Sequence, residues 1–412
     1  MGRRAPPAPP AWYDSMTMAE QPDRPDREIS HRRALGFVVL LGIVSLFADM
    51  TYEGARSVTG PFLAVLGATG TAVGIIAGFG ELVGYGLRLV SGLISDRTRR
   101  YWAITIAGYV INLLAVPLLA LAGRWEVAAG LMIAERAGKA IRNPPRDAML
   151  SHAALRLGAG WAFGLHEALD QAGAVIGPLI VAVVLHARNR YQDSFAILLI
   201  PALLALSILI GARMLYPRPQ ELESGESQPP SSKWPRAFWL YLIAIGLVAA
   251  GYVDFPLIAY HFERNAVVPR IWIPVFYSVA MGVDALAALV FGRWFDRAGM
   301  VVLVPAILVS SLLAPLTFLG GFSVALLGMG VWGIGMGAQD SIMRAVIARM
   351  VSPDRRGSAY GLFNACYGLT WFLGSALMGA LYDLSVPSLI AFSVCAQLLA
   401  VPLLLRLRDR TP

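Results

Sequence analysis

The sequence predicts an all-α membrane protein with twelve transmembrane helices in two six-helix repeats. Of its 412 residues, 57% are hydrophobic and 15% are charged, whereas soluble domains are about 45–50% apolar and about 25% charged. Apolar segments of about 20 residues, the length with which an α-helix crosses about 30 Å of hydrocarbon, follow one another along the chain. The two halves also share glycine and charge patterns at matching positions, which indicates an internal repeat.

Twelve apolar segments are the predicted membrane spans. They cover residues 34–60, 71–94, 101–123, 126–150, 160–186, 193–215, 237–261, 271–295, 300–319, 322–349, 358–382 and 387–406. Residues 1–33 are polar, rich in Pro and Arg and without the apolar core of a signal peptide, so we expect a disordered cytoplasmic tail. The longest internal polar segment, 217–236, follows the sixth span, and we expect it to link a bundle over 34–216 to a bundle over 237–408.

The distribution of Lys and Arg predicts the orientation in the membrane. With the N-terminus inside, most of the 34 Lys and Arg residues lie in the tails or at cytosolic helix ends, and few lie outside. Because basic residues concentrate in cytoplasmic loops, we expect both termini in the cytoplasm and the protein in the inner membrane. The same distribution explains the formal net charge of +8 without a nucleic-acid partner.

Enzymatic and ATP-driven functions have no signal in the sequence. There is no P-loop and no Gly-x-Ser-x-Gly elbow, so we predict neither an enzyme nor an ATP-driven pump, and we expect no cofactor. The two cysteines, Cys366 and Cys395, lie in apolar runs and indicate neither a disulfide framework nor a metal site.

Two similar segments end the second and the eighth span. Residues 92–97 read GLISDR, and residues 292–297, 200 positions later, read GRWFDR. We expect the glycines to let two helices approach closely, and each Asp to lie at the N-terminal end of the following helix, where the helix dipole favours an anion. The predicted gating residues of this pair are Gly92, Asp96, Arg97, Arg100, Gly292, Asp296 and Arg297. A weaker repeat pairs Gly177 with Gly374.

These segments resemble a motif of the major facilitator superfamily, the loop between helices 2 and 3. The matching residues are Gly92, Asp96, Arg97 and Arg100, whereas Arg99 stands where a glycine is usual. The segment GAVIGP in the fifth span, with Gly173, Gly177 and Pro178, is similar to a motif found mainly in proton-linked exporters of the superfamily. The resemblance implies alternating access by rocking of the two halves about the linker, a small-molecule substrate, a monomer, and export in preference to uptake.

Ionisable residues within the first span are candidates for substrate binding or proton coupling, because a charge inside the membrane is costly. Asp49, Glu53 and Arg56 stand at i, i+4 and i+7 and share one helix face. A carboxyl group that changes between neutral and charged forms can couple proton movement to substrate movement. The alternative is a structural pair in which Arg56 neutralises Glu53.

Further candidates lie in later spans. Arg136 is similar to the helix 4 arginine of the superfamily. His166 and Asp170, at i and i+4, fit a proton relay, because histidine changes its charge near neutral pH; the alternative is hydrogen-bonded packing. Asp254 and Asp340 have no Lys or Arg within the membrane in their own half, so we expect them to bind water, a proton or a ligand.

The charges counted within the spans predict an acidic cavity, because nine acids stand against three arginines. We therefore predict proton-coupled export of a cationic or neutral compound. The alternatives are an importer or facilitator of a metabolite, an exporter of metal cations, and a membrane receptor or scaffold that transports nothing.

Overall fold

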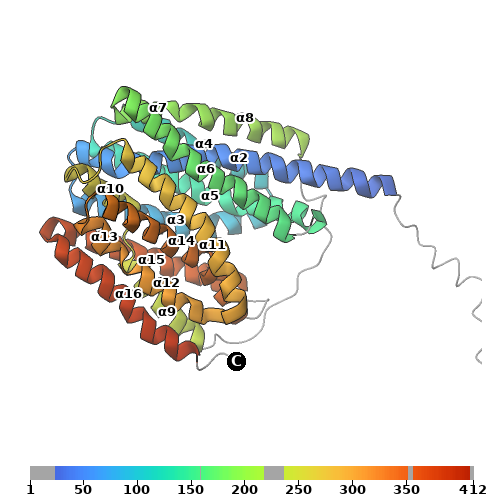
Figure 1. Cartoon of the computed structure of the whole chain (residues 1–412). Coiled ribbons are helices and arrows are strands. Elements are labelled where there is room, and N and C mark those ends of the chain that lie inside the picture. The colour runs from blue at the N-terminus through green and yellow to red at the C-terminus, as the bar shows by residue number, and fades with distance from the viewer. Residues whose placement is uncertain (1–23, 158, 218–235, 351–355, 409–412) are drawn as a thin grey trace, which may run out of the picture.

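The computed structural model describes residues 24–157, 159–217, 236–350 and 356–408, and every element assigned within these ranges is a helix. The N-terminal half, blue to green in Figure 1, lies beside the C-terminal half, yellow to red. Long helices run through both halves in roughly one direction, as expected for a bundle that crosses a membrane.

Each half crosses the bundle six times. The N-terminal half contains α2 (Arg24–Val65), α3 (Gly70–Thr98), α4 (Tyr101–Leu118) with η1 (Leu119–Leu121), α5 (Trp125–Leu157), α6 (Ala159–Arg188), and α7 (Tyr191–Ile197) with α8 (Leu199–Leu215). The C-terminal half contains α9 (Arg236–Gly251) with α10 (Phe255–Arg264), α11 (Trp272–Ala298), η3 (Gly299–Val302) with α12 (Leu303–Ser310) and α13 (Leu313–Leu319), α14 (Phe322–Met350), α15 (Arg356–Leu384) and α16 (Val386–Arg408).

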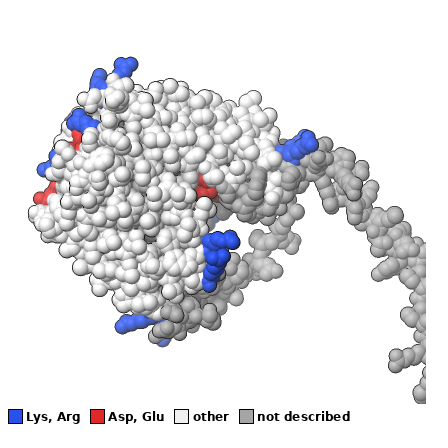
Figure 2. All heavy atoms as spheres, in the orientation of Figure 1, with Lys and Arg blue, Asp and Glu red and all other residues white. Residues whose placement is uncertain are grey.

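The predicted membrane architecture is confirmed. Among the described residues, 11 spans are long and apolar enough to cross a membrane. The twelfth crossing is α5, whose many charged residues keep it from being recognised as a membrane span by its hydropathy. It packs against both α3 and α4 inside the bundle. Figure 2 shows a broad face that is almost free of charged side chains, with Lys, Arg, Asp and Glu gathered toward its ends. Such a face suits a surrounding bilayer.

One predicted boundary differs from the structure. Residues 24–33, expected in a disordered tail, form the first turns of α2, which project beyond the bundle in Figure 1. Residues 1–23 of that tail, and all of the predicted linker except its end residues, lie outside the described ranges.

The repeated segments at 92–97 and 292–297 lie in the last turns of α3 and α11, not in loops. The expectation that Asp96 and Asp296 begin the following helices is therefore wrong; their side chains lie outside the described part of the structure. The helices continue because the backbone leaves the helical region only at Arg99, with φ 52°, and at Gly299, with φ 68°. A left-handed residue at this position is a common helix terminator.

The glycine repeat corresponds to a repeated helix contact. α6 packs on α2 so closely that a Cβ atom built on Gly177 would lie 2.3 Å from the carbonyl oxygen of Met50. α15 packs on α9 in the same way, with a built Cβ on Gly374 only 2.1 Å from the carbonyl oxygen of Ala250. Small residues permit such contacts between membrane helices, so the sequence repeat reflects a packing repeat.

Candidate substrate and coupling site

The two halves meet closely at the end of the molecule where α2 finishes and α3 begins, which we call the closed end (Figure 1, left). A Cβ atom built on Gly74 of α3 would lie 2.3 Å from the carbonyl oxygen of Ser375 on α15. The Asp383 carboxylate accepts hydrogen bonds from the backbone N–H groups of Gly70 at 2.9 Å and Thr71 at 2.7 Å. Asp383 of the C-terminal half therefore caps the first turn of α3 in the N-terminal half.

Further contacts seal the closed end. The Tyr260 hydroxyl donates to the backbone carbonyl of Ala68 at 2.9 Å, and the Tyr191 hydroxyl donates to the Glu263 carboxylate at 2.8 Å. Both bonds join the two halves. At the opposite end, which we call the open end, α6 and α14 carry the exposed acids Glu167 and Asp340. Figure 2 shows the surface indented between the two halves on that side.

A chain of alternating charges crosses between the halves at the centre of the molecule. Arg56 on α2 donates to Asp254 of the C-terminal half at 3.0 Å and lies 3.4 Å from Glu81 on α3. Glu81 also lies 3.2 Å from Arg136, which in turn lies 3.6 Å from Glu135 on the same helix, α5. The five side chains, which we call the central network, are all largely buried, so each charge depends on its neighbours for stabilisation.

The central network borders a small internal cavity of about 30 Å³. Its lining includes Tyr52, Arg56, Glu135, Arg136 and Asp254. A cavity of this volume that is bordered by charged groups has room for about two water molecules. The network therefore combines fixed charges with space for water at the junction of the two halves.

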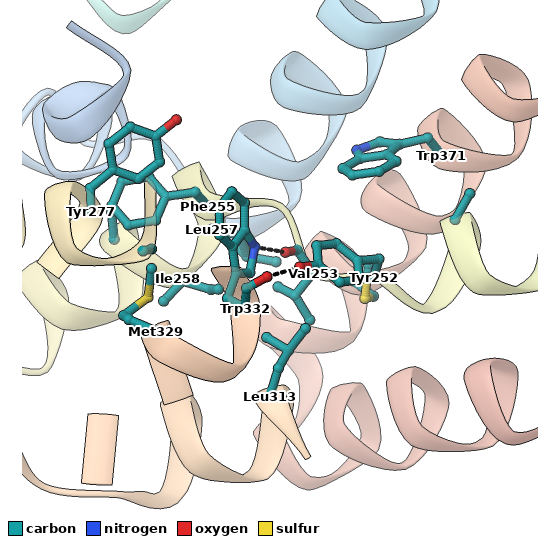
Figure 3. Close-up of a cluster of buried hydrophobic side chains, with 14 of the residues drawn as sticks. Tyr252, Val253, Phe255, Leu257, Ile258, Tyr277, Leu313, Met329, Trp332 and Trp371 are labelled. Atoms are coloured by element: carbon teal, nitrogen blue, oxygen red, sulfur yellow. Dashed lines mark hydrogen bonds between the residues drawn. The ribbon is translucent and has the colours of Figure 1, made fainter. Parts of the chain in front are cut away.

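Asp254 is placed by a break in the seventh crossing, which the sequence analysis wrongly treats as one helix over 237–261. α9 ends at Gly251, and α10 begins at Phe255 with Asp254 as its N-cap, accepting the Phe255 N–H at 2.9 Å. Trp332 holds the broken segment: its indole N–H donates to the Val253 carbonyl at 3.0 Å (Figure 3). Non-helical backbone inside a membrane requires such partners, and broken helices of this kind often line transport sites.

A second contact joins the halves next to the central network. The Tyr277 hydroxyl on α11 donates to the Glu53 carboxylate on α2. Asp49, one turn away on α2, lies 3.6 Å from Arg142 of α5, and Lys139 of α5 donates to the Tyr52 hydroxyl. The three ionisable residues predicted on α2 are therefore together, but Arg56 pairs with Asp254 and Glu81 instead of neutralising Glu53 by a direct bond.

Three cations were not among the predicted site residues, because their positions were expected at a cytosolic helix end. Lys139, Arg142 and Arg146 lie inside the N-terminal half; Arg142 is completely buried, with its guanidinium 4.3 Å from the centre of the Tyr109 ring. They offset half of the negative excess counted within the spans, so the charge balance of this half is less acidic than predicted. Their spacing of three and four residues, which puts them on one helix face, was the available signal.

The predicted relay of His166 and Asp170 lies in a third polar cluster. The Nε2 atom of His166 lies 3.5 Å from the Ser45 hydroxyl, which also accepts a hydrogen bond from Arg146 at 3.0 Å. His166 and Asp170 interact electrostatically, as their shared face predicts. This cluster is contained in the N-terminal half, in contrast to the central network.

The predicted gating residues lie away from the central network. Gly173 and Gly177 form the contact of α6 with α2, and Pro178 follows within α6. The side chains of Arg97 and Arg297, in the last turns of α3 and α11, and of Arg100, the N-cap of α4, are exposed. Gly92 and Gly292 lie one to two turns earlier in α3 and α11. Within the described ranges, no three His, Cys, Asp or Glu side chains are arranged to hold a metal ion.

Comparison with known proteins agrees with this architecture. A model of the Major Facilitator Superfamily (MFS) matches residues 39–338 and 255–412. An uncharacterized protein of Mycobacterium tuberculosis is 42% identical over 379 residues, which cover 90% of this chain and 93% of that protein. An uncharacterized MFS-type transporter of Methanocaldococcus jannaschii is 27% identical over 374 residues, covering 87% of this chain and 90% of the relative. The crystal structure of the nucleoside transporter NupG is similar in fold, with a TM-score of 0.70, 13% identity, and coverage of 90% of this chain and 98% of that one.

Proposed function

Since the chain belongs to the Major Facilitator Superfamily and is a membrane transporter, we propose that it moves a small molecule by proton-coupled alternating access. The observation that supports this most is the buried pair between Arg56 and Asp254, which joins the two halves at 3.0 Å. To open the closed end, the halves have to part, and this pair lies on their junction. Protonation of Asp254 would remove the attraction to Arg56. Proton binding would therefore weaken the contact between the halves and favour their separation.

The contact of Tyr277 with Glu53 supports the same mechanism. It also crosses the junction, and its acceptor is a second buried carboxyl group. Two carboxyl groups that change partners when the halves move provide a physical route from a proton gradient to a conformational change.

The distribution of basic residues supports an inner-membrane protein with cytoplasmic termini. The open end, which carries the start of α2, would then face the cytoplasm, ready to take up a substrate for export. The GAVIGP segment of α6, which resembles an exporter motif, supports that direction. We propose a cationic or neutral organic substrate, because the described part of the C-terminal half contributes the acids Asp254, Asp284 and Asp340 to the region between the halves and no buried Lys or Arg.

The test starts with purified protein screened by thermal shift against organic cations and neutral compounds. A compound that stabilises the protein is then loaded into proteoliposomes, and its flux is measured with and without an imposed pH gradient. We expect flux to follow the gradient and to fall at least tenfold in Asp254→Asn, which keeps the side-chain volume but removes the charge that Arg56 binds. Asp193→Asn, at the start of α7, is the matched control and should transport normally.

Flux that ignores the pH gradient would reject proton coupling and leave a facilitator. Absence of counterflow for every stabilising compound would reject transport in favour of a receptor or scaffold. Inverted or right-side-out vesicles separate export from import, because only one orientation accumulates the substrate.

A further inference from the structure

Asp284 on α11 differs from the other buried acids, Asp49, Glu53 and Asp254, in having neither a counter-ion nor a hydrogen-bond donor among the described residues. Asp254, Glu81 and Asp49 each lie within 4.0 Å of an arginine, and Glu53 accepts the hydroxyl of Tyr277. Asp284 is only 5% exposed, yet it makes no ion pair or hydrogen bond with the described part of the chain. It is two helical turns from Tyr277 and shares its inward face.

Among the side chains that the structure describes, the charged groups that act on Asp284 from neighbouring elements are acids. They are Asp340 on α14, Glu167 on α6 and Glu53 on α2. A further titratable neighbour is the Tyr252 hydroxyl between α9 and α10, which already donates to the Trp332 carbonyl. An ionised Asp284 would therefore lose its hydration and face three like charges, with no compensating cation among the described side chains.

Asp284 cannot move away from these acids by shifting its backbone. α14 packs on α11 at Gly333 and Gly337, and a Cβ atom built on Gly337 would lie 2.4 Å from the carbonyl oxygen of Asp284. The tight contact fixes the backbone of Asp284, whose carboxyl group interacts electrostatically with Asp340 and Glu167. Both of these acids are exposed toward the open end, so protons in water can reach the cluster from that side.

We propose that Asp284 is a proton-binding residue of the transport cycle and holds its proton in the conformation described. In this step a proton from water at the open end bonds to a carboxylate oxygen of Asp284, after passing Asp340 or Glu167, and no other bond forms or breaks. When the halves move and the closed end opens, the proton leaves to water on the opposite side. The inference rests on proton-coupled transport as the function and names the residue that carries the proton.

Infrared spectroscopy of protein with ¹³C-labelled Asp carboxyl groups tests the proposal without a substrate. At neutral pH we expect a C=O stretching band of a protonated Asp, shifted by the label. The band should lose intensity in Asp284→Asn and stay unchanged in Asp383→Asn, whose carboxylate already accepts three hydrogen bonds. An identical band in Asp284→Asn, or no band in the wild-type protein, would overturn the proposal; the second result needs no variant to fold.

Transport assays distinguish this inference from the proposed function. We expect Asp284→Asn to reduce flux driven by a pH gradient at least tenfold while retaining counterflow, in which both sides hold substrate and no proton gradient acts. Flux that is independent of pH in the wild-type protein would refute proton coupling even if the infrared band is present. Loss of counterflow together with loss of the thermal shift by an organic amine would identify Asp284 as the site of the substrate's ammonium group, and would contradict a proton-binding role.

Discussion

At the scale of single residues, the junction of the two halves depends on the pair of Arg56 and Asp254. Asp49, Glu53, Arg56 and Asp254 stood out because charges are rare inside membrane spans. Arg56 and Asp254 are 198 residues apart in the chain, and their contact depends on how the two halves lie against each other. No helical spacing contains that information. Residues of one helix face, such as those of α5, were predictable by contrast, because their spacing alone places them together.

Arg99 stands where the superfamily motif usually has a glycine, and its backbone adopts a conformation that L-residues rarely take. Its φ of 52° is in the left-handed region, whereas Gly299, the corresponding residue of the second half, takes φ 68° without a side chain. We expect Arg99→Gly to raise the free energy of unfolding by about 1 kcal/mol, since the left-handed conformation costs an L-residue about that amount.

A titration with denaturing detergent, followed by circular dichroism, measures this change. Arg100→Gly is the matched control, because it removes the same charge at a neighbouring position where φ is −91°. Equal stabilisation by both substitutions would attribute the effect to charge instead of backbone conformation.

At the scale of helices, most lengths and positions could be predicted from apolar segments, while the breaks and close contacts could not. Gly251 and Pro256 flank the break between α9 and α10, but the same residue types occur inside unbroken membrane helices, as Pro178 does in α6. The break persists because Trp332 satisfies the exposed backbone from another helix. The ends of α3 and α11 relative to the GLISDR and GRWFDR segments depend on which residue adopts a left-handed backbone conformation. Hydropathy contains no information about that residue.

The contact of α6 with α2 predicts a specific sensitivity. We expect Gly177→Ala to lower the free energy of unfolding by about 1–3 kcal/mol, because the added Cβ would overlap the Met50 carbonyl oxygen and force the helices apart. Gly84→Ala on α3 is the control: no atom lies within 4 Å of its built Cβ, and alanine favours helix by about 1 kcal/mol. The same detergent titration compares them, and equal effects of the two substitutions would refute the packing argument.

At the scale of the whole molecule, the twelve crossings and the repeat of two halves were predictable from composition, segment length and the glycine pattern. The conformation was not, because the closed and open ends differ only in contacts between halves. Contacts at Gly74, Asp383 and Tyr260 concentrate at one end and fix the structure with that end sealed. The function at the level of a transporter follows from the family, and the polar junction of the halves explains how such a bundle can respond to protons.

Asp383 offers a test of the balance between conformations. Its carboxylate accepts three hydrogen bonds from Gly70 and Thr71 across the halves, and hydrogen bonds to a charged group contribute about 1.5–3 kcal/mol each at most. We expect Asp383→Ala to increase the population with a separated closed end by at least tenfold. Spin labels at the exposed positions Val65 and Leu384, in protein without Cys366 and Cys395, report this separation by pulsed electron resonance.

Asp193→Ala serves as the control, because it removes an acid near the same end without a hydrogen bond to the described residues. Unchanged distance distributions in Asp383→Ala would show that glycine packing alone holds the end shut.

The cap that Asp383 provides also bears on which substitutions a lineage can accumulate. Its main donors are peptide N–H groups, which every amino acid except proline retains. Position 70 is restricted to glycine, because a built Cβ there would lie 2.5 Å from the Tyr382 ring and 2.8 Å from the Asp383 carboxylate. Position 71, by contrast, can change its side chain and still donate its peptide N–H. The acceptor has no such freedom, so tolerance to mutation is divided unequally between the two sides of a single contact.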